Sequence, residues 1–121
     1  MPDPSAYAKG VMGETAAENH LIAKGFSPIA RRYRSRYGEI DLIMQNDDLL
    51  VFIEVKTRER GNLLSAQSAV TPAKQRRLIS TARCFLNEHS EYAEHMIRFD
   101  VVTVAKDGIV HIADAFQGCE W

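Results

Sequence analysis

Residues 39–56 of the chain read EIDLIMQNDDLLVFIEVK, two apolar stretches on either side of a short polar turn. Successive side chains of a β-strand point to opposite faces of the sheet, so this pattern predicts a hairpin with charges set among apolar residues. If Asp47-Asp48 form a two-residue turn, Asn46 pairs with Leu49. The turn therefore fixes which residues of the two strands face each other.

Counting inward from this turn sets Asp41 opposite Glu54, and Glu39 opposite Lys56. Opposed side chains have Cβ atoms roughly 4.5–5.5 Å apart, and like charges placed there destabilise a sheet. Two facing carboxylates therefore favour a cation between them, and a neighbouring lysine completes a set suited to metal-assisted phosphodiester hydrolysis. A cross-strand ion pair between Asp41 and Lys56, with Glu54 facing solvent, is the structural alternative.

The totals are those of one ordinary globular domain. The chain has 121 residues, of which 45% are hydrophobic and 26% charged. It contains no apolar run long enough to cross a bilayer, and residues 1–13 lack the basic start and apolar stretch of a secretory signal. Cys84 and Cys119 form no metal-binding pattern, and we expect reduced thiols in a cytoplasmic protein.

Basic residues are concentrated in two segments, although the formal net charge is only −1. Residues 24–36 carry five bases and no acid, and residues 56–83 carry seven bases against Glu59 alone. From residue 84 onward, seven acids face two bases. This asymmetry indicates a side of the protein that binds a polyanion, with an ordinary solvated surface as the equal alternative.

Hydrophobic periodicity and turn residues predict the remaining elements. The first helix begins between Ser5 and Gly13 and ends at Gly25, and Thr71-Pro72 starts the second, which ends between Asn87 and His89. The expected strands are 26–33, the hairpin, 97–105 and 109–116. We expect one domain over residues 1–121, in the order α-β-β-β-α-β-β, with a start (1–12) that can be flexible and a mobile loop at 57–70.

Glu14 falls in the middle of the apolar stripe of the first helix. A carboxylate on a packing face needs a partner or a metal ion. One alternative is an ion pair with an arginine of residues 31–36, and the other is a contribution to a site beside the hairpin.

The arrangement of Asp41 and Glu54-Val55-Lys56 resembles the D…ExK signature of the restriction-endonuclease-like nucleases. More closely, the chain is similar to the bacterial UPF0102 family, assigned as endonucleases by similarity and related to archaeal Holliday-junction resolvases. Four stretches carry this likeness: Gly13-Glu14 with Ala16-Ala17, Gly38 to Ile43, Phe52 to Arg58, and Ala69 to Arg77. Ile40 departs from the fuller signature, which has proline before the aspartate.

The resemblance implies an α/β, restriction-endonuclease-like three-layer fold, with a mixed central sheet flanked by helices. It implies a metal-dependent endonuclease in which Mg²⁺, with Mn²⁺ as a substitute, is held by Asp41, Glu54 and the backbone carbonyl of Val55. Lys56 would be the site lysine. Glu14 matches the helix-one carboxylate of the resolvases and is expected as a further metal ligand, which completes the coordination or binds a second ion. The expected catalytic residues are Glu14, Asp41, Glu54 and Lys56.

The expected partner is nucleic acid, DNA more than RNA and of branched or flapped shape, with no membrane contact. Phosphates would be bound by basic side chains that position nucleic acid without reading its sequence: Arg31, Arg32, Arg34, Arg36, Arg58, Lys74 and Arg77. A homodimer is expected by analogy with resolvases alone. Two alternatives stay open: a catalytically silent module that binds DNA, RNA or a partner protein, and a scaffold that dimerises through its sheet edge.

Overall fold

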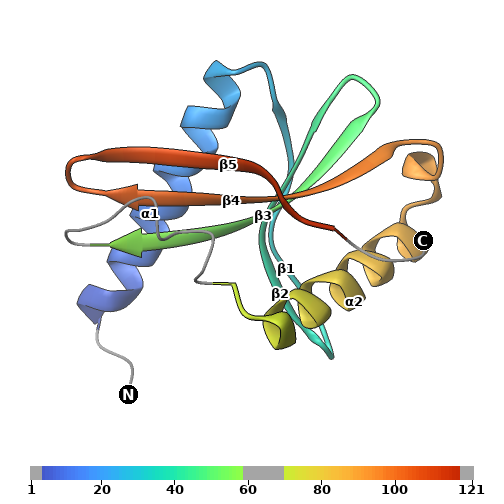
Figure 1. The fold of residues 1–121 in the computed structure, drawn as a ribbon, viewed down its shortest axis with the longest axis horizontal. Helices are drawn as coiled ribbons and strands as arrows, with labels where there is room; N and C mark the ends of the chain where they lie inside the picture. The colour runs from blue at the N-terminus through green and yellow to red at the C-terminus, as the bar shows by residue number, and fades with distance from the viewer. Residues whose placement is uncertain (1–3, 59–69, 118–121) are drawn as a thin grey trace.

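The computed structural model describes residues 4–58 and 70–117 and, within them, the side chains from residue 11 onward. Two helices and five strands follow in the predicted order α-β-β-β-α-β-β, with a short 3₁₀ turn before β4 that the sequence did not predict (Figure 1). Their bounds are α1 Pro4–Ala23, β1 Ser27–Ser35, β2 Gly38–Asn46, β3 Leu49–Arg58, α2 Pro72–Glu88, η2 Ser90–Tyr92, β4 Met96–Ala105 and β5 Gly108–Phe116. The predicted element order is confirmed.

The five strands form one mixed sheet in the order β1-β2-β3-β4-β5. All neighbours are antiparallel except β3 and β4, which run parallel because α2 lies on the crossover between them. The two helices cover opposite faces: Leu21 of α1 packs with Ile53, and Phe85 of α2 packs with Phe52. The predicted architecture, a mixed sheet between helical layers, is confirmed (Figure 1).

Local signals place the end of α1 and the start of α2 close to where the sequence predicts them, whereas α1 begins at Pro4, one residue before the predicted range. Gly25, two residues after the last residue of α1, adopts φ +100°, a conformation that glycine reaches without strain. At the start of α2, the Thr71 side chain accepts a hydrogen bond from the backbone N–H of Lys74, and Pro72 occupies the first turn. Both helices are therefore set by their caps as well as by their apolar faces.

The segment predicted as a mobile loop, residues 57–70, is partly regular. Thr57 and Arg58 extend β3, paired with Val104 and Ala105 of β4. Val70 at the other end is 5% exposed and packs in the core beside α2. The remaining residues, 59–69, lie outside the described residues, so the sequence placed the end of β3 too early. The parallel partner explains the extension, because it supplies hydrogen bonds that a lone hairpin lacks.

Within the described residues, neither helix combines the length and apolar character needed to cross a bilayer.

Candidate active site

The hairpin has the register that its turn predicts. Asn46 pairs with Leu49 across Asp47-Asp48, and the pairing continues to Leu42 opposite Ile53. Asp41 and Glu54 are the next residues along each strand. Their carboxyl groups lie close enough for the protonated form of Asp41 to share a hydrogen bond with Glu54.

Beyond this point the two strands separate, which is where the predicted register fails. β3 continues beside β4, with Glu54 opposite Val101, whereas β2 continues beside β1 toward α2 (Figure 1). Glu39 therefore forms its ion pair with Arg34 of β1, at 2.8 Å, and the expected pairing of Glu39 with Lys56 is wrong. The separation exposes the backbone of β3 to side chains from β2.

The Asp41 carboxylate uses this opening. Its Oδ2 accepts a hydrogen bond of 2.8 Å from the backbone N–H of Val55, in the place that a ladder partner would take. Burial, and then the negative charge of Glu54, raises the pKa of Asp41 from 3.8 to about 7, although the Val55 hydrogen bond opposes the shift. The site therefore disfavours a state in which both carboxyl groups are ionised.

Two lysines flank Glu54, whose side chain is only 7% exposed. Lys74 Nζ of α2 lies 3.1 Å from Glu54 Oε1, and Lys56 Nζ lies 3.9 Å from the same oxygen. Burial, with the adjacent Lys74, lowers the pKa of Lys56. Burial opposes the charged form of Lys74 too, but Glu54 outweighs it and the pKa of Lys74 is raised. Glu54 thus does not face solvent, as the structural alternative required.

Glu14 lies at the edge of this site and is paired. Its two carboxylate oxygens accept hydrogen bonds of 2.9 and 3.2 Å from the Arg32 guanidinium. The alternative of an ion pair with an arginine of residues 31–36 is therefore confirmed. The negative charge of Glu14 nevertheless acts on the hairpin acids: after burial and Glu54, it also raises the pKa of Asp41.

Gly13 explains how α1 comes so near. A Cβ atom at this position would collide with the side-chain methyl of Thr57, one residue beyond Lys56. Glycine therefore allows the helix to pack against β3 at the level of the site. The sequence contained the glycine, but a glycine within a helix gives no sign of what approaches it.

The expected nucleic-acid-binding residues have different surroundings. Arg31 and Arg32 are paired with glutamates of α1, Arg34 with Glu39, and the Arg36 guanidinium lies 4.9 Å from the centre of the Tyr37 ring. Lys74 belongs to the carboxylate site itself. Arg58 and Arg77 are exposed.

The donor set suits a hard divalent cation. Asp41 and Glu54 offer carboxylate oxygens, and Mg²⁺ is commonly bound through one or two carboxylates while it keeps several waters. Among the described residues, no group of three or more histidine, cysteine, aspartate or glutamate side chains is arranged as a metal site. Any ion here would therefore rest on the two hairpin acids, with the backbone of Val55 beside them.

A second buried acid, Asp100 of β4, was missed by the sequence analysis. It accepts hydrogen bonds from Nε and Nη2 of the Arg98 guanidinium, at 2.8 and 2.9 Å, and from the backbone N–H of Asp114. His111 Nε2 lies 2.6 Å from it, and His111 Nδ1 lies 3.0 Å from Lys24 Nζ. His111 thus links Asp100 to Lys24 and has a structural role.

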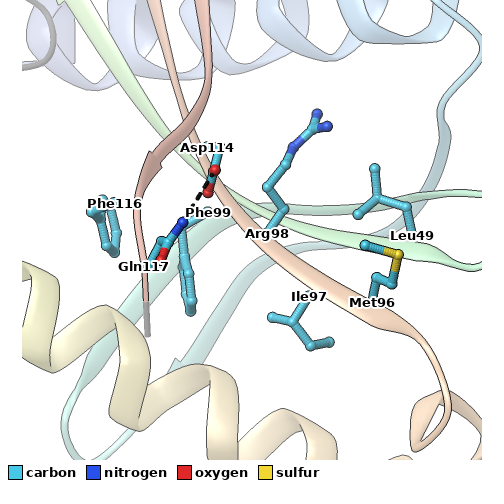
Figure 2. A pocket seen from close by; sticks show the side chains of 8 residues that line it. All are labelled: Leu49, Met96, Ile97, Arg98, Phe99, Asp114, Phe116 and Gln117. Atoms are coloured by element: carbon cyan, nitrogen blue, oxygen red, sulfur yellow. Dashed lines mark hydrogen bonds between the residues drawn. The ribbon is translucent and has the colours of Figure 1, made fainter. Parts of the chain in front are cut away.

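A pocket of about 440 Å³ opens near this cluster, at the end of β4 away from Lys56 (Figure 2). The Arg98 side chain and the hydrogen-bonded pair of Asp114 and Gln117 border it. Its lining is otherwise apolar and consists of Leu49, Met96, Ile97, Phe99 and Phe116. None of the predicted site residues lines it.

Comparison with known proteins gives a family and several relatives. The model of the uncharacterised protein family UPF0102 matches residues 13–104. A UPF0102 protein of Rhodopseudomonas palustris (strain BisB18) is 42% identical over 114 residues, covering 93% of this chain and 83% of the relative. One from Saccharophagus degradans is 42% identical over 107 residues, covering 88% and 91%.

Two solved structures are also similar. A repair endonuclease from Pyrococcus abyssi has a TM-score of 0.43 and 24% identity over 89% of this chain and 41% of its own. SfsA of Pyrococcus furiosus, solved in complex with Ca²⁺, has a TM-score of 0.34 and 15% identity over 89% and 63%. This chain therefore spans less than two thirds of either protein.

Proposed function

The chain belongs to UPF0102, as its resemblance implied, and from its site we propose that it is a metal-dependent endonuclease that hydrolyses phosphodiester bonds. The preferred substrate in this proposal is branched or flapped DNA. The supporting observation is the convergence of Asp41 and Glu54, two carboxyl groups that burial and mutual repulsion keep from ionising together. Such a pair is unfavourable unless a cation binds there.

In the proposed site, Asp41, Glu54 and the Val55 carbonyl hold Mg²⁺, or Mn²⁺ in its place. When bound, the cation would neutralise charge on the scissile phosphate and help to generate a nucleophile from water at neutral pH. Glu54 is held in position by Lys74, and Asp41 by the backbone of β3. The two acids thus need little rearrangement to act together.

Lys56 lies two residues after Glu54 in β3, on the same face of the strand, with its ammonium 3.9 Å from Glu54 Oε1. In this role it orients the attacking water or stabilises negative charge that develops on the phosphate. Burial strengthens either interaction, because the lysine side chain is only 18% exposed. We therefore expect Lys56→Ala to lower cutting more than binding.

Arg58 and Arg77 would bind flanking phosphates, since both are exposed on elements that lead to the site. Such contacts attract the backbone of nucleic acid without selecting sequence, which favours selection by shape. A homodimer would present two sites to a branched substrate. Sedimentation of the protein with and without branched DNA tests this part of the proposal.

Cleavage assays test the proposal directly. Wild type should cut labelled branched or flapped DNA in Mg²⁺ or Mn²⁺, and Asp41→Ala and Glu54→Ala should lose at least about 100-fold in rate. Glu39→Gln is the matched control, because it alters a carboxylate of the same strand that is paired with Arg34 instead. If wild type cuts none of the branched, flapped or single-stranded DNAs, or if the two site variants cut equally well, the enzymatic proposal is wrong.

The second candidate is a silent module that binds nucleic acid without cutting it. One observation favours it: the Lys74 ammonium, 3.1 Å from Glu54, already supplies a positive charge beside one of the two acids. Calorimetry with Mn²⁺ separates the candidates. Binding that Glu54→Gln abolishes supports the enzyme, whereas salt-sensitive nucleic-acid binding with no metal dependence supports the module.

A further inference from the structure

Strand β1 is connected to α1 by two similar ion pairs, which involve the adjacent residues Arg31 and Arg32. Arg31 binds both oxygens of Glu18, at 2.8 and 2.6 Å, and Arg32 binds both oxygens of Glu14, at 2.9 and 3.2 Å. In a regular strand, neighbouring side chains point to opposite faces, so only one of the two arginines should reach the helix. A local departure from strand geometry must account for the second.

Arg32 has that departure. Its φ is +51°, in the left-handed region that is unfavourable for a residue with a Cβ atom by roughly 1–2 kcal/mol. This conformation occurs within β1 and lets the Arg32 side chain reach the same helix as Arg31. Backbone strain is thus associated with the contact between Arg32 and Glu14.

The strained arginine lies beside the candidate metal site. Arg31 pairs with Leu42 and Tyr33 with Ile40, so the intervening Arg32 is opposite Asp41. Glu14, which Arg32 holds, follows Gly13, where α1 packs against Thr57 of β3. The Arg32–Glu14 pair therefore lies beside the part of the sheet that carries Asp41.

The guanidinium fork binds either a carboxylate or a phosphate through two parallel hydrogen bonds. With 29% of its side chain exposed, Arg32 can be reached by a phosphate, whereas Glu14 is only 13% exposed. Resting on the proposed function, we propose that Arg32 is a positioning residue that exchanges Glu14 for a phosphate of the bound strand. The released Glu14 then becomes a third oxygen donor for the cation at Asp41 and Glu54.

This exchange makes the binding of cation and nucleic acid cooperative, because each favours the state in which the Arg32–Glu14 pair is broken. Removing the guanidinium should therefore release Glu14 without any nucleic acid. Arg32→Asn is the suitable variant, since asparagine tolerates the left-handed conformation at this position. Arg31→Gln is its matched control, because it breaks the equivalent pair one residue away.

The first experiment is calorimetric titration with Mn²⁺ alone. Arg32→Asn should bind about tenfold more tightly than wild type, Arg31→Gln should match wild type, and Arg32→Asn with Glu14→Gln should lose the gain. If wild type binds Mn²⁺ and Arg32→Asn binds no more tightly, the exchange is wrong and the metal site stands. If neither binds Mn²⁺, both the metal site and the exchange are wrong. Thermal unfolding of each variant confirms that it is folded.

The second experiment measures anisotropy of labelled branched DNA in EDTA, where metal-dependent cutting is absent. Glu14→Gln should bind about three- to tenfold more tightly than wild type, because the Glu14 carboxylate no longer competes with phosphate for the Arg32 guanidinium. The gain should vanish when Arg32→Asn is added. If Glu14→Gln tightens binding as much on the Arg32→Asn background as on the wild-type background, the gain comes from the loss of a negative charge alone, and the exchange is overturned.

Discussion

Asp41 of β2 is partly buried and Asp100 of β4 is buried in the same sheet, yet their surroundings move their pKa values in opposite directions. Asp100 receives hydrogen bonds from Arg98, His111 and the backbone of Asp114. Burial would raise the pKa of Asp100, but these donors outweigh it and hold the pKa below its usual value. Asp41 accepts one backbone hydrogen bond, which favours its ionised form. Burial, and then the charge of the facing Glu54, outweigh this hydrogen bond and raise the pKa of Asp41 to about 7.

The difference separates a structural carboxylate from one available for chemistry. The charge of Asp100 is neutralised within the fold, so nothing further is needed to stabilise it. At the hairpin pair, Lys74 and Lys56 both contact Glu54, whereas burial and the charge of Glu54 disfavour the ionised form of Asp41. Sites that leave charge unbalanced reduce stability and are typical of functional regions.

The largest expected effect on stability is at Asp100, the acid whose charge is neutralised within the fold. Asp100→Ala should lower the free energy of unfolding by about 3–4 kcal/mol, because it leaves the Arg98 guanidinium and the Asp114 N–H without their acceptor. Urea unfolding at pH 7 measures the loss, with Asp107→Ala in the exposed turn between β4 and β5 as the control. A loss below about 1 kcal/mol would mean that the network contributes little to stability.

Substitution of Asp41 is expected to change stability in the opposite direction to substitution of Asp100. Between pH 4 and 7, native Asp41 holds a proton that the unfolded chain has released, so stability falls as pH rises through this window. Asp41→Asn keeps an acceptor for the Val55 N–H but cannot ionise. The free energy of unfolding of Asp41→Asn, relative to that of wild type, should therefore be about 2–3 kcal/mol larger at pH 8 than at pH 5.

Urea unfolding in EDTA at both pH values measures this change. Glu39→Gln serves as the control, since the Glu39 carboxylate has an arginine partner. A difference between Asp41→Asn and wild type that stays constant with pH would show that Asp41 is ionised throughout, as Asp100 is.

Much of this arrangement follows from local rules. The Asp47-Asp48 turn fixes the register from Asn46 to Leu42, and one more step brings Asp41 to Glu54. The Thr71 hydroxyl and Pro72 set the start of α2, which directs Lys74 toward the site. Turns and caps act within a few residues, so they can be recognised in a sequence.

The rest depends on contacts between distant parts of the chain. The expected pairing of Glu39 with Lys56 failed because β3 leaves β2 to pair with β4, a partner more than forty residues away. The Asp100 network joins β4 to β5 and to Lys24 after α1, and no spacing of Arg98, Asp100 and His111 distinguishes them from surface residues. The left-handed conformation of Arg32 likewise has no sequence signal, because no glycine or asparagine marks it.

The raised pKa of Asp41 should also make metal affinity depend on pH. A proton and a cation compete for Asp41, so the Mn²⁺ affinity of wild type should rise by about tenfold per unit from pH 5 to pH 7 and level off above. Calorimetry in buffers of different ionisation enthalpy gives the number of protons released. An affinity that does not change between pH 5 and pH 7 would place the ion away from Asp41.

The smallest effect sharpens the comparison by testing how closely α1 must approach the unbalanced site. Gly13→Ala should lower the free energy of unfolding by about 1 kcal/mol, since a clash with the Thr57 methyl outweighs the gain in helix propensity. Thr57→Ser removes that methyl and should restore stability in the double variant, as thermal unfolding can measure. If Thr57→Ser does not rescue Gly13→Ala, the contact between this helix and β3 does not depend on the glycine. The charge of Glu14 would then reach Asp41 for another reason.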